Sequence, residues 1–373
     1  MATEYITMIE KKFIPKTYTK LLETGHVTWA SPSNIALVKY WGKKENQIPE
    51  NPSISFTLSN CKTITKLNFS KKENDGNFSF DVFLGEEKKE DFKPKIETFF
   101  KRIEIYLPFL KDYYFKIETQ NTFPHSSGIA SSASGMSALS LCLMSVEKQL
   151  ITANNFVNKD LDADFFTEKA SFLARLGSGS ACRSLEGDLV VWGEHKEIPG
   201  SSNLFGLKYP FKVHENFKNY QDTILLVDKG EKQVSSTVGH NLMHGHAFAQ
   251  ERFKQAHTNL SNLIPVLKAG DLNTFIKIVE SEALTLHAMM MTSMPYFILM
   301  KPKTLEIINK IWTYREKTNS KICFTLDAGA NVHLLYPVSE TESVSKFIKN
   351  ELVAYCENGH YICDQIGFGA KQL

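Results

Sequence analysis

The sequence lacks the features that mark several large classes of protein. No stretch approaches the ~18 consecutive apolar residues that a membrane-spanning helix needs, and the first twenty residues hold no apolar segment followed by a cleavage site. Charge of one sign is not in excess, because 43 Lys and Arg face 41 Asp and Glu, a net charge of +2. The sequence therefore favours neither a membrane nor nucleic acid as a partner.

The spacing of the cysteines also indicates no particular chemistry. The six cysteines form no C-x-x-C pair, and most stand among apolar residues. This pattern is typical of reduced, buried thiols and predicts no zinc–thiolate site. With no secretory signal, we expect a cytoplasmic protein. The chain also lacks internal repeats and the G-K-[ST] signature of a Walker A loop.

Length and pattern predict two domains. At about 100–200 residues per domain, 373 residues suggest two. Helical and strand-like segments mix in both halves, which favours an α+β fold. A Pro-, Gly- and Ser-containing loop over 194–220 carries the boundary. We expect a lysine-rich extension packed on the surface (1–25), a first domain (26–205) and a second (206–373).

Two local expectations concern the first domain. The stretch after His26 is strand-like but is expected to break at Ser31-Pro32-Ser33. Alternating runs on both sides of Asp75-Gly76 predict a β-hairpin over 63–87.

Four segments carry residues suited to chemistry on anions. The first, "PHSSGIASSASG" (124–135), has small residues that open a helix, an arrangement that presents backbone N–H groups to a phosphate. Its alternative is a Ser/Ala-rich helix start packed closely on another helix. The second, "NIALVKYWGKK" (34–44), places Lys39 and Lys43 four residues apart, on one face if the turn is helical. The alternative is two solvated lysines beside a buried Tyr-Trp pair.

The third segment, "GSGSACRS" (177–184), combines glycines that allow close approach, hydroxyl donors and one arginine. This composition is typical of an anion-binding site and also of a turn that leads into a buried helix. The fourth, "TLDAGANVHLLY" (325–336), puts Asp327 at a strand end. That is a usual place for a catalytic carboxylate and also for a turn-forming aspartate.

The order of these segments is more specific than any one of them. Together with "NPSISFTLS" (51–59) and "KQVSSTVG" (232–239), they occur from about residue 26 to the end in the order seen in the diphosphomevalonate decarboxylase family of the GHMP kinase superfamily, which this chain resembles. The resemblance implies a two-domain GHMP-kinase-like fold. Its N-terminal domain is like domain 2 of ribosomal protein S5, its C-terminal domain is ferredoxin-like, and the site lies in the cleft between them.

The implied reaction is the ATP- and Mg²⁺-dependent decarboxylation of mevalonate 5-diphosphate to isopentenyl diphosphate, ADP, phosphate and CO₂, by a homodimer. The resemblance assigns catalysis to Lys39, Arg183 and Asp327. Substrate binding falls to Tyr40, Trp41, Gly42, Lys43, Ser178, Gly179, Ser180, Ala181, Cys182, Arg183, Ser236 and Thr237. ATP falls to Gly128, Ile129, Ala130, Ser131, Ser132 and Ala133. No residue is assigned as a metal ligand.

The implied mechanism begins with Asp327, which accepts or orients the 3-hydroxyl proton as that hydroxyl attacks the γ-phosphate. Lys39 and the loop N–H groups neutralise the phosphoryl oxygens. The 3-phosphate then leaves, and loss of CO₂ from the carboxylate that Arg183 orients supplies electrons for the double bond.

Two departures from the family pattern keep alternatives open. Pro52 stands where eukaryotic relatives commonly have a serine, and the 81–90 segment lacks an arginine that some relatives place near the same hairpin to meet a substrate phosphate. A decarboxylase of mevalonate 5-phosphate remains possible. So do a GHMP small-molecule kinase, which has no need of Arg183, and a non-catalytic binding protein, from which Lys39 or Asp327 would be expected to be lost.

Overall fold

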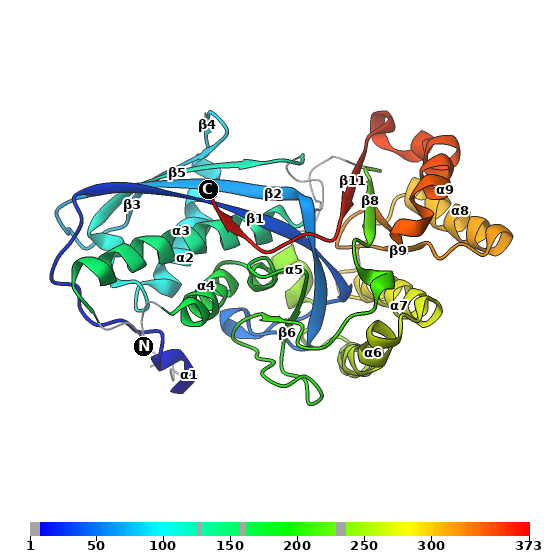
Figure 1. Ribbon diagram of the computed structural model, residues 1–373, viewed down its shortest axis with the longest axis horizontal. Helices are drawn as coiled ribbons and strands as arrows, with labels where there is room; N and C mark the ends of the chain where they lie inside the picture. The colour runs from blue at the N-terminus through cyan, green and yellow to red at the C-terminus, as the bar shows by residue number, and fades with distance from the viewer. Residues whose placement is uncertain (1–7, 125–128, 157–161, 229–235) are drawn as a thin grey trace.

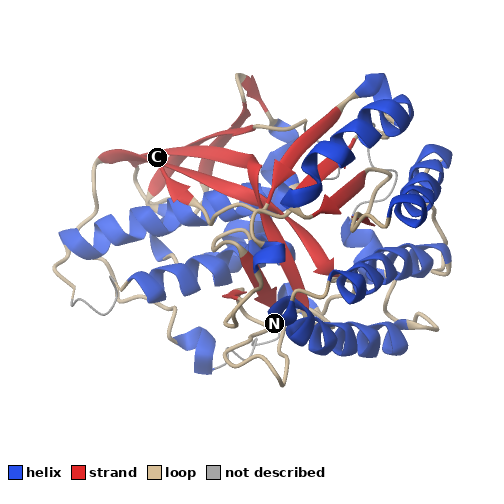
Figure 2. Cartoon of the chain, turned by 45° about the vertical axis from the view of Figure 1, so that its right-hand side comes forward, coloured by secondary structure: helices blue, strands red, loops and turns tan. Residues whose placement is uncertain are grey.

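The computed structural model describes residues 8–124, 129–156, 162–228 and 236–373. Two β-sheets, each with helices packed against it, form two halves of the molecule, and the long strands β1 and β2 run from the first half toward the second (Figure 1). The same division is visible when the molecule is turned (Figure 2).

The first half contains a sheet with the strand order β12-β1-β2-β5-β3-β4, to which β6 and β7 are added at β2. Its elements are α1 (Met8–Lys11), β1 (Thr24–Val38), β2 (Ser53–Lys71), β3 (Ser79–Leu84), β4 (Glu87–Lys88), α2 (Lys93–Ile103), β5 (Tyr113–Asn121), α3 (Ser131–Ala153), α4 (Ala163–Gly177), β6 (Leu189–Trp192) and β7 (Leu207–Lys208).

Helices α2, α3 and α4 lie against one face of this sheet (Figure 1). Helix α3 is buried over most of its length, which explains why small and apolar residues occur on all of its sides rather than in one stripe. The core between the helices and the sheet is rich in phenylalanine, including Phe99, Phe100 and Phe115. This packing fixes the start of α3, where the 124–135 segment ends, and the last turn of α4, where the 177–184 segment begins.

The expected break in β1 is wrong. The strand continues through Pro32, which pairs with Lys62, and the pairing register shifts between Pro32 and Asn34. Across this shift β1 has one residue, Ser33, whereas β2 has four, 58–61, so the extra residues bulge from β2 and β1 continues through Pro32 without a break. The second part of β1 runs on toward the other half of the molecule (Figure 1).

The expected hairpin over 63–87 is also wrong. Both strands exist as β2 and β3, but β5 lies between them and pairs with β3 in parallel. The Asp75-Gly76 turn signal is local, whereas the pairing is decided by which apolar faces meet in the core. The turn therefore connects two strands that are not neighbours.

The N-terminal extension is anchored rather than merely laid on the surface. Phe13 is completely buried and stacks on Phe172 of α4 with ring centroids 4.7 Å apart. Burying a phenylalanine side chain contributes roughly 1.5–3 kcal/mol.

The second half contains an antiparallel sheet of order β11-β8-β10-β9 with helices α6 to α9 beside it (Figure 1). The remaining elements along the chain are β8 (Gln221–Leu225), α5 (Ser236–Asn241), α6 (Ala249–Ala269), α7 (Leu272–Met291), α8 (Pro302–Thr318), β9 (Cys323–Thr325), β10 (Val332–Tyr336), α9 (Thr341–Phe347), β11 (Tyr361–Gln365) and β12 (Lys371–Gln372). The last of these, β12, belongs to the first sheet and pairs with β1.

The end of the chain thus returns to the first half, crossing the expected boundary at residue 205, which stays a prediction. Asp364 at the end of β11 accepts three backbone hydrogen bonds from the Ser59–Cys61 bend of β2. These bonds tie the two sheets together where β2 passes between them. None of the helices in the described ranges is long and apolar enough to cross a membrane.

Candidate active site

The predicted phosphate segment and the "GSGSACRS" segment meet in space. Ser132, in the first turn of α3, shares a hydrogen bond with Ser178, which follows α4, at an Oγ–Oγ distance of 3.0 Å. Ala130 stands before α3 in a left-handed conformation (φ 44°). Ile129 is buried, and its carbonyl accepts a hydrogen bond from Ser33. Gly128, also predicted for this loop, lies outside the described residues.

The other residues of this helix start split between surface and core. Ser131 is half-buried and Ser132 exposed, whereas Ala133 is buried. The free donors at the N-terminus of a long helix and the nearby serine hydroxyls suit a phosphate group.

The "GSGSACRS" segment forms a short 3₁₀ turn, Gly179–Arg183, shortly after α4. Gly179 has no room for a side chain, because a Cβ there would lie 2.9 Å from the Tyr40 hydroxyl and 2.8 Å from the Trp192 ring. Close packing therefore requires glycine at this position. Ser180 is half-buried, and its carbonyl accepts a hydrogen bond from Asn34.

Cys182 and Ala181 are buried and face the interior of the first half. The Cys182 thiol donates to the Gly179 carbonyl, and burial raises its pKa to about 12. The thiol thus stays protonated at neutral pH and is unsuited to nucleophilic chemistry.

Arg183 is the residue of this turn that is aimed at the site. It is 3% exposed, its Nε donates to Asn34, and one guanidinium nitrogen donates to Ser53. Its guanidinium carbon also lies 5.8 Å from the centre of the Trp192 ring. These two hydrogen-bond partners, Asn34 and Ser53, are neutral side chains, and burial lowers the pKa of Arg183. A buried cation held by neutral groups favours an anionic ligand.

The Asn51-Pro52-Ser53 stretch forms another wall. Pro52, which replaces the serine common in relatives, is packed against Gly193. The next residue, Ser53, supplies the hydroxyl that contacts Arg183. The sequence comparison missed this contact because it considered position 52 alone.

The lysines of "NIALVKYWGKK" do not share a helical face, so that part of the prediction is wrong. Lys39 follows the last residue of β1, and no helix includes it or Lys43. The Lys39 ammonium lies 3.0 Å from Asp327, whereas Lys43 donates to Gln47 at 3.0 Å. The two cations serve different parts of the site.

Tyr40 lies between these lysines and has an unused polar group. Its hydroxyl is buried, and none of the described residues forms a hydrogen bond with it. Its ring meets that of Trp192 edge-on at 4.6 Å, and burial raises its pKa. Buried hydroxyls in native proteins normally have a partner, so Tyr40 is a natural contact for a ligand.

The Lys39–Asp327 pair joins the two halves of the molecule. Lys39 comes from the end of β1, and Asp327 follows β9 in the second sheet. The lysine side chain is 2% exposed and the aspartate 29%. Burial lowers the pKa of Lys39, and Asp327 and Glu282 oppose that effect. The arrangement places a buried cation and a more accessible carboxylate side by side, as a proton-accepting or phosphoryl-stabilising pair requires.

Sequence reasoning missed His240, which docks α5 on the site. Its ring lies 4.2 Å from that of Tyr40 and 4.6 Å from that of Trp41, and its Nδ1 accepts the Gly42 N–H at 3.0 Å. Burial lowers its pKa to about 3, so it stays neutral and able to accept. The predicted Ser236 and Thr237 begin the same helix, but their side chains lie outside what the structure describes. No motif in the sequence marked His240.

Two further cations lie near Lys43. Lys95 and Arg102 of α2 act together with burial to lower the pKa of Lys43. Arg102 donates to the Leu176 carbonyl at 2.9 Å, which places it beside the end of α4 where Ser178 follows. Lys95 and Arg102 thus supply positive charge near Lys43, although the 81–90 segment contains no arginine.

Comparisons with known proteins match nearly the whole chain. Residues 31–204 match the diphosphomevalonate decarboxylase-like N-terminal domain, and residues 223–366 match the mevalonate 5-diphosphate decarboxylase C-terminal domain. The chain belongs to the diphosphomevalonate decarboxylase family. This confirms the predicted family and its reaction class, that of a carboxy-lyase.

Individual relatives agree. The diphosphomevalonate decarboxylase of Ganoderma lucidum is 28% identical over 92% of this chain and 85% of its own length. That of Saccharomyces cerevisiae is 29% identical over 86% and 79%. Mevalonate diphosphate decarboxylase from Staphylococcus aureus shares the fold, with 26% identity, a TM-score of 0.77 and coverage of 94% and 98%.

A structure described as MDDEF in complex with MVAPP, AMPPCP and magnesium has 25% identity to this chain. Its TM-score is 0.78, and the match covers 94% of this chain and 99% of that one. The predicted two-domain α+β fold class is thereby confirmed.

We expect Lys43→Ala to raise the KM for the phosphorylated substrate by about tenfold or more while changing kcat little, because hydrogen bonds to charged groups contribute about 1.5–3 kcal/mol. Lys44→Ala is the matched control: Lys44 is 61% exposed and ion-paired only loosely, at 3.6 Å, with Glu50. Steady-state kinetics on both variants decides the point. A Lys43→Ala variant with the same KM as the Lys44→Ala control and the wild-type protein would show that Lys43 is a solvated lysine.

Proposed function

We propose that this protein converts mevalonate 5-diphosphate and ATP to isopentenyl diphosphate, ADP, phosphate and CO₂, and that the residues gathered around Lys39 carry out the reaction. The observation that supports this most is the Lys39–Asp327 ion pair at 3.0 Å together with a buried Arg183 held by neutral partners. A kinase needs the first element, and a decarboxylase also uses the second.

Asp327 is proposed to accept or orient the proton of the substrate's 3-hydroxyl. The oxygen of that hydroxyl bonds to the γ-phosphorus as the bond from phosphorus to ADP breaks. Lys39 lies next to the developing negative charge on the phosphoryl oxygens. Because its ammonium is buried, its electrostatic contribution is larger than that of a solvated lysine.

Arg183 is proposed to bind the substrate carboxylate. After phosphoryl transfer, the C3–oxygen bond breaks with both electrons leaving on phosphate. The carboxyl C–C bond then breaks, its electron pair forms the double bond, and CO₂ is released. The fork of Arg183, fixed by Asn34 and Ser53, would hold the carboxylate in line for that step.

The diphosphate end is proposed to lie toward Tyr40 and Lys43. The unpartnered Tyr40 hydroxyl can donate to a phosphate oxygen, and Lys43, Lys95 and Arg102 supply charge for more than one phosphate. Ser178 and Ser180 from the 3₁₀ turn, and Ser236 and Thr237 from α5, are proposed as further contacts. Trp41 and Gly42 shape the wall that His240 holds.

ATP is proposed to place its phosphates at the start of α3, over residues 128–133. The described residues contain no cluster of three or more His, Cys, Asp or Glu side chains able to hold a metal ion. Mg²⁺ does not require such a cluster, because it usually binds through nucleotide phosphates, one or two carboxylates and retained waters. When bound, the metal would neutralise part of the negative charge of the nucleotide phosphates.

Assembly and location follow from the family resemblance. We propose a homodimer in the cytoplasm. Sedimentation or light scattering of the purified protein would establish its mass against the 42.3 kDa of one chain.

The substrate is tested by comparing mevalonate 5-diphosphate with mevalonate 5-phosphate. Because Lys95 and Arg102 add charge beside Lys43, we expect kcat/KM to be higher for the diphosphate by at least about tenfold, the effect of one charge-assisted contact. A preference for the monophosphate would assign the chain to the alternative that the Pro52 departure left open.

A further inference from the structure

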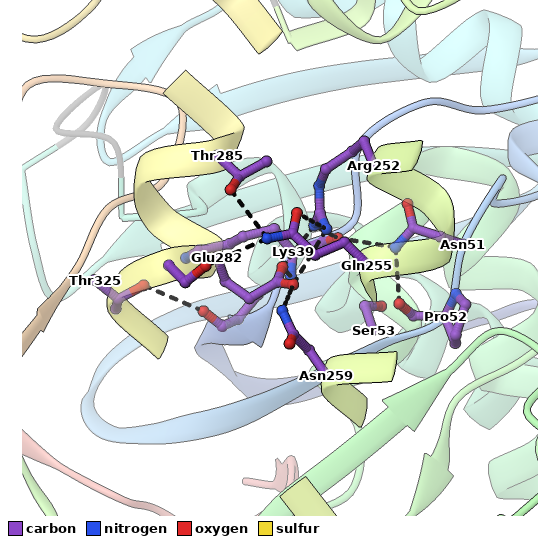
Figure 3. A network of polar contacts seen from close by, with 12 residues as sticks. Lys39, Asn51, Pro52, Ser53, Arg252, Gln255, Asn259, Glu282, Thr285 and Thr325 are labelled. Atoms are coloured by element: carbon purple, nitrogen blue, oxygen red, sulfur yellow. Dashed lines mark hydrogen bonds and ion pairs between the residues drawn. The ribbon is translucent and has the colours of Figure 1, made fainter. Parts of the chain in front are cut away.

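The peptide group of Lys39 is held by side chains and not by a neighbouring strand. The last paired residue of β1 is Val38, opposite Ile54, so Lys39 lies just beyond the ladder. Its N–H donates to Glu282 Oε2 at 2.8 Å. Its carbonyl accepts from Arg252 at 3.0 Å and from Asn51 at 2.9 Å (Figure 3). Side chains therefore supply the hydrogen bonds that the N–H and the carbonyl of Lys39 do not receive from a neighbouring strand.

Glu282 on α7 and Arg252 on α6 form a doubly hydrogen-bonded pair, with N–O distances of 3.1 and 2.5 Å. Both side chains are 0% exposed. Asn259 adds a bond to Glu282 Oε1 at 2.6 Å, so the two carboxylate oxygens together accept four hydrogen bonds (Figure 3). Such a carboxylate has no freedom to reorient, and it fixes whatever it binds.

Stability alone does not account for this pair. The cost of removing two charges from water often equals or exceeds their attraction, so a buried ion pair is weak evidence for a stabilising role. Here the pair also reaches across the molecule, from the helices of the second half to the end of β1. The residue it holds is the one whose side chain meets Asp327.

The same helix holds the other member of the ion pair. His287, five residues after Glu282 on α7, lies with its Nε2 3.2 Å from the Asp327 carbonyl. A carbonyl can only accept, so Nε2 carries the proton, and burial lowers the pKa of His287 to about 4, which keeps the ring neutral. Helix α7 thus fixes the main chain of Lys39 through Glu282 and that of Asp327 through His287.

We propose that Glu282, aligned by Arg252, is a positioning residue for the phosphoryl-transfer step: it fixes the main chain of Lys39 so that the ammonium stays against Asp327 and faces the transferring phosphoryl group. This rests on the proposed function only in that Lys39 acts on a phosphoryl group. Glu282 touches neither substrate nor nucleotide in this arrangement.

The first test is Glu282→Gln, assayed by ADP formation. Glutamine keeps the size but cannot accept all four bonds, so Lys39 loses its fixed geometry. A misplacement of about 1 Å can cost about 10²-fold in rate, and we expect kcat to fall about 10- to 100-fold while the KM values for ATP and substrate change less than about threefold.

The matched control is Glu280→Gln. Glu280 is on the same helix, is 8% exposed and pairs with Arg315 at 2.6 Å, but no hydrogen bond links it to Lys39 or Asp327. We expect this variant to lose thermal stability with kcat near the wild-type value. Equal kcat losses in the two variants would overturn the proposal, because the effect would then come from loosening α7 in general.

A double-mutant cycle separates positioning from structure. In a Lys39→Met background, adding Glu282→Gln should lower kcat no further, because there is no ammonium left to position. A further loss of tenfold or more would overturn the proposal.

If Glu282→Gln does not fold, Asn259→Ala removes one neutral bond to the carboxylate. That variant should still show a several-fold loss in kcat, and wild-type kcat would overturn the proposal. Because ADP is measured, a wild-type protein that makes ADP without CO₂ would refute the decarboxylase assignment while leaving this comparison valid.

Discussion

Asp327→Asn is expected to leave the protein folded and able to bind ATP while lowering kcat by about 10²–10⁴-fold or more, the usual contribution of a positioned proton acceptor. Asparagine matches the size of aspartate but carries no charge and is a poor acceptor for the 3-hydroxyl proton. The substitution would also lower the pKa of the neighbouring Lys39. Burial already lowers the pKa of Lys39, and Asp327 is the largest influence that opposes this.

The alternative role for Asp327 is to shape the turn that follows β9. In the structure that turn uses the Asp327 carbonyl, which accepts from the Gly329 N–H at 2.7 Å and from His287. These backbone contacts do not need the carboxylate, so asparagine should preserve the turn. Intact melting temperature and nucleotide binding with turnover gone would support catalysis. Near wild-type turnover in a folded Asp327→Asn protein would remove Asp327 from the mechanism.

Lys39→Met is expected to have the second largest effect. Methionine retains most of the length and packing of the buried stem, but the charge facing the phosphoryl group disappears. Loss of one preorganised donor to a developing charge costs about 10²–10³-fold in kcat, so we expect a fall of that size with KM values little changed. Rapid-quench measurement of ADP formation would place the loss in the phosphoryl-transfer step.

The same substitution removes the ammonium that faces Asp327, but the aspartate side chain is 29% exposed and stays hydrated. The protein should therefore remain folded. A Lys39→Met variant whose KM rises while kcat is unchanged would show that Lys39 binds substrate in the ground state and does not stabilise the transition state.

The sequence predicted the candidate site residues best where they lie in short motifs. The Ser178–Arg183 turn, the Lys39–Lys43 stretch and Asp327 were all identified as candidates, and the structure brings Lys39 to Asp327 and Tyr40 to Gly179. Family membership and fold class also follow from the order of these segments. Short, chemically distinctive motifs can be recognised in a sequence without any knowledge of tertiary contacts.

Prediction failed where distant parts of the chain decide the outcome. The path of β1 through Pro32 depends on a bulge in β2, and the pairing of β3 depends on β5, which lies between it and β2. Glu282 and His240 reach the site from positions about two hundred residues away from those they contact. Each lies in an ordinary helical pattern, and no local signal distinguishes it from a residue that merely packs.

The central claim is that one site couples phosphoryl transfer to loss of the carboxylate. The most direct measurement uses mevalonate 5-diphosphate labelled in its carboxyl carbon, with ATP and Mg²⁺, and follows labelled CO₂ and ADP together through a single turnover of the wild-type protein. We expect one CO₂ for each ADP, with no accumulation of a 3-phosphorylated acid. ADP formed with the label still in an acid-stable product would contradict it and show that the chain is a kinase.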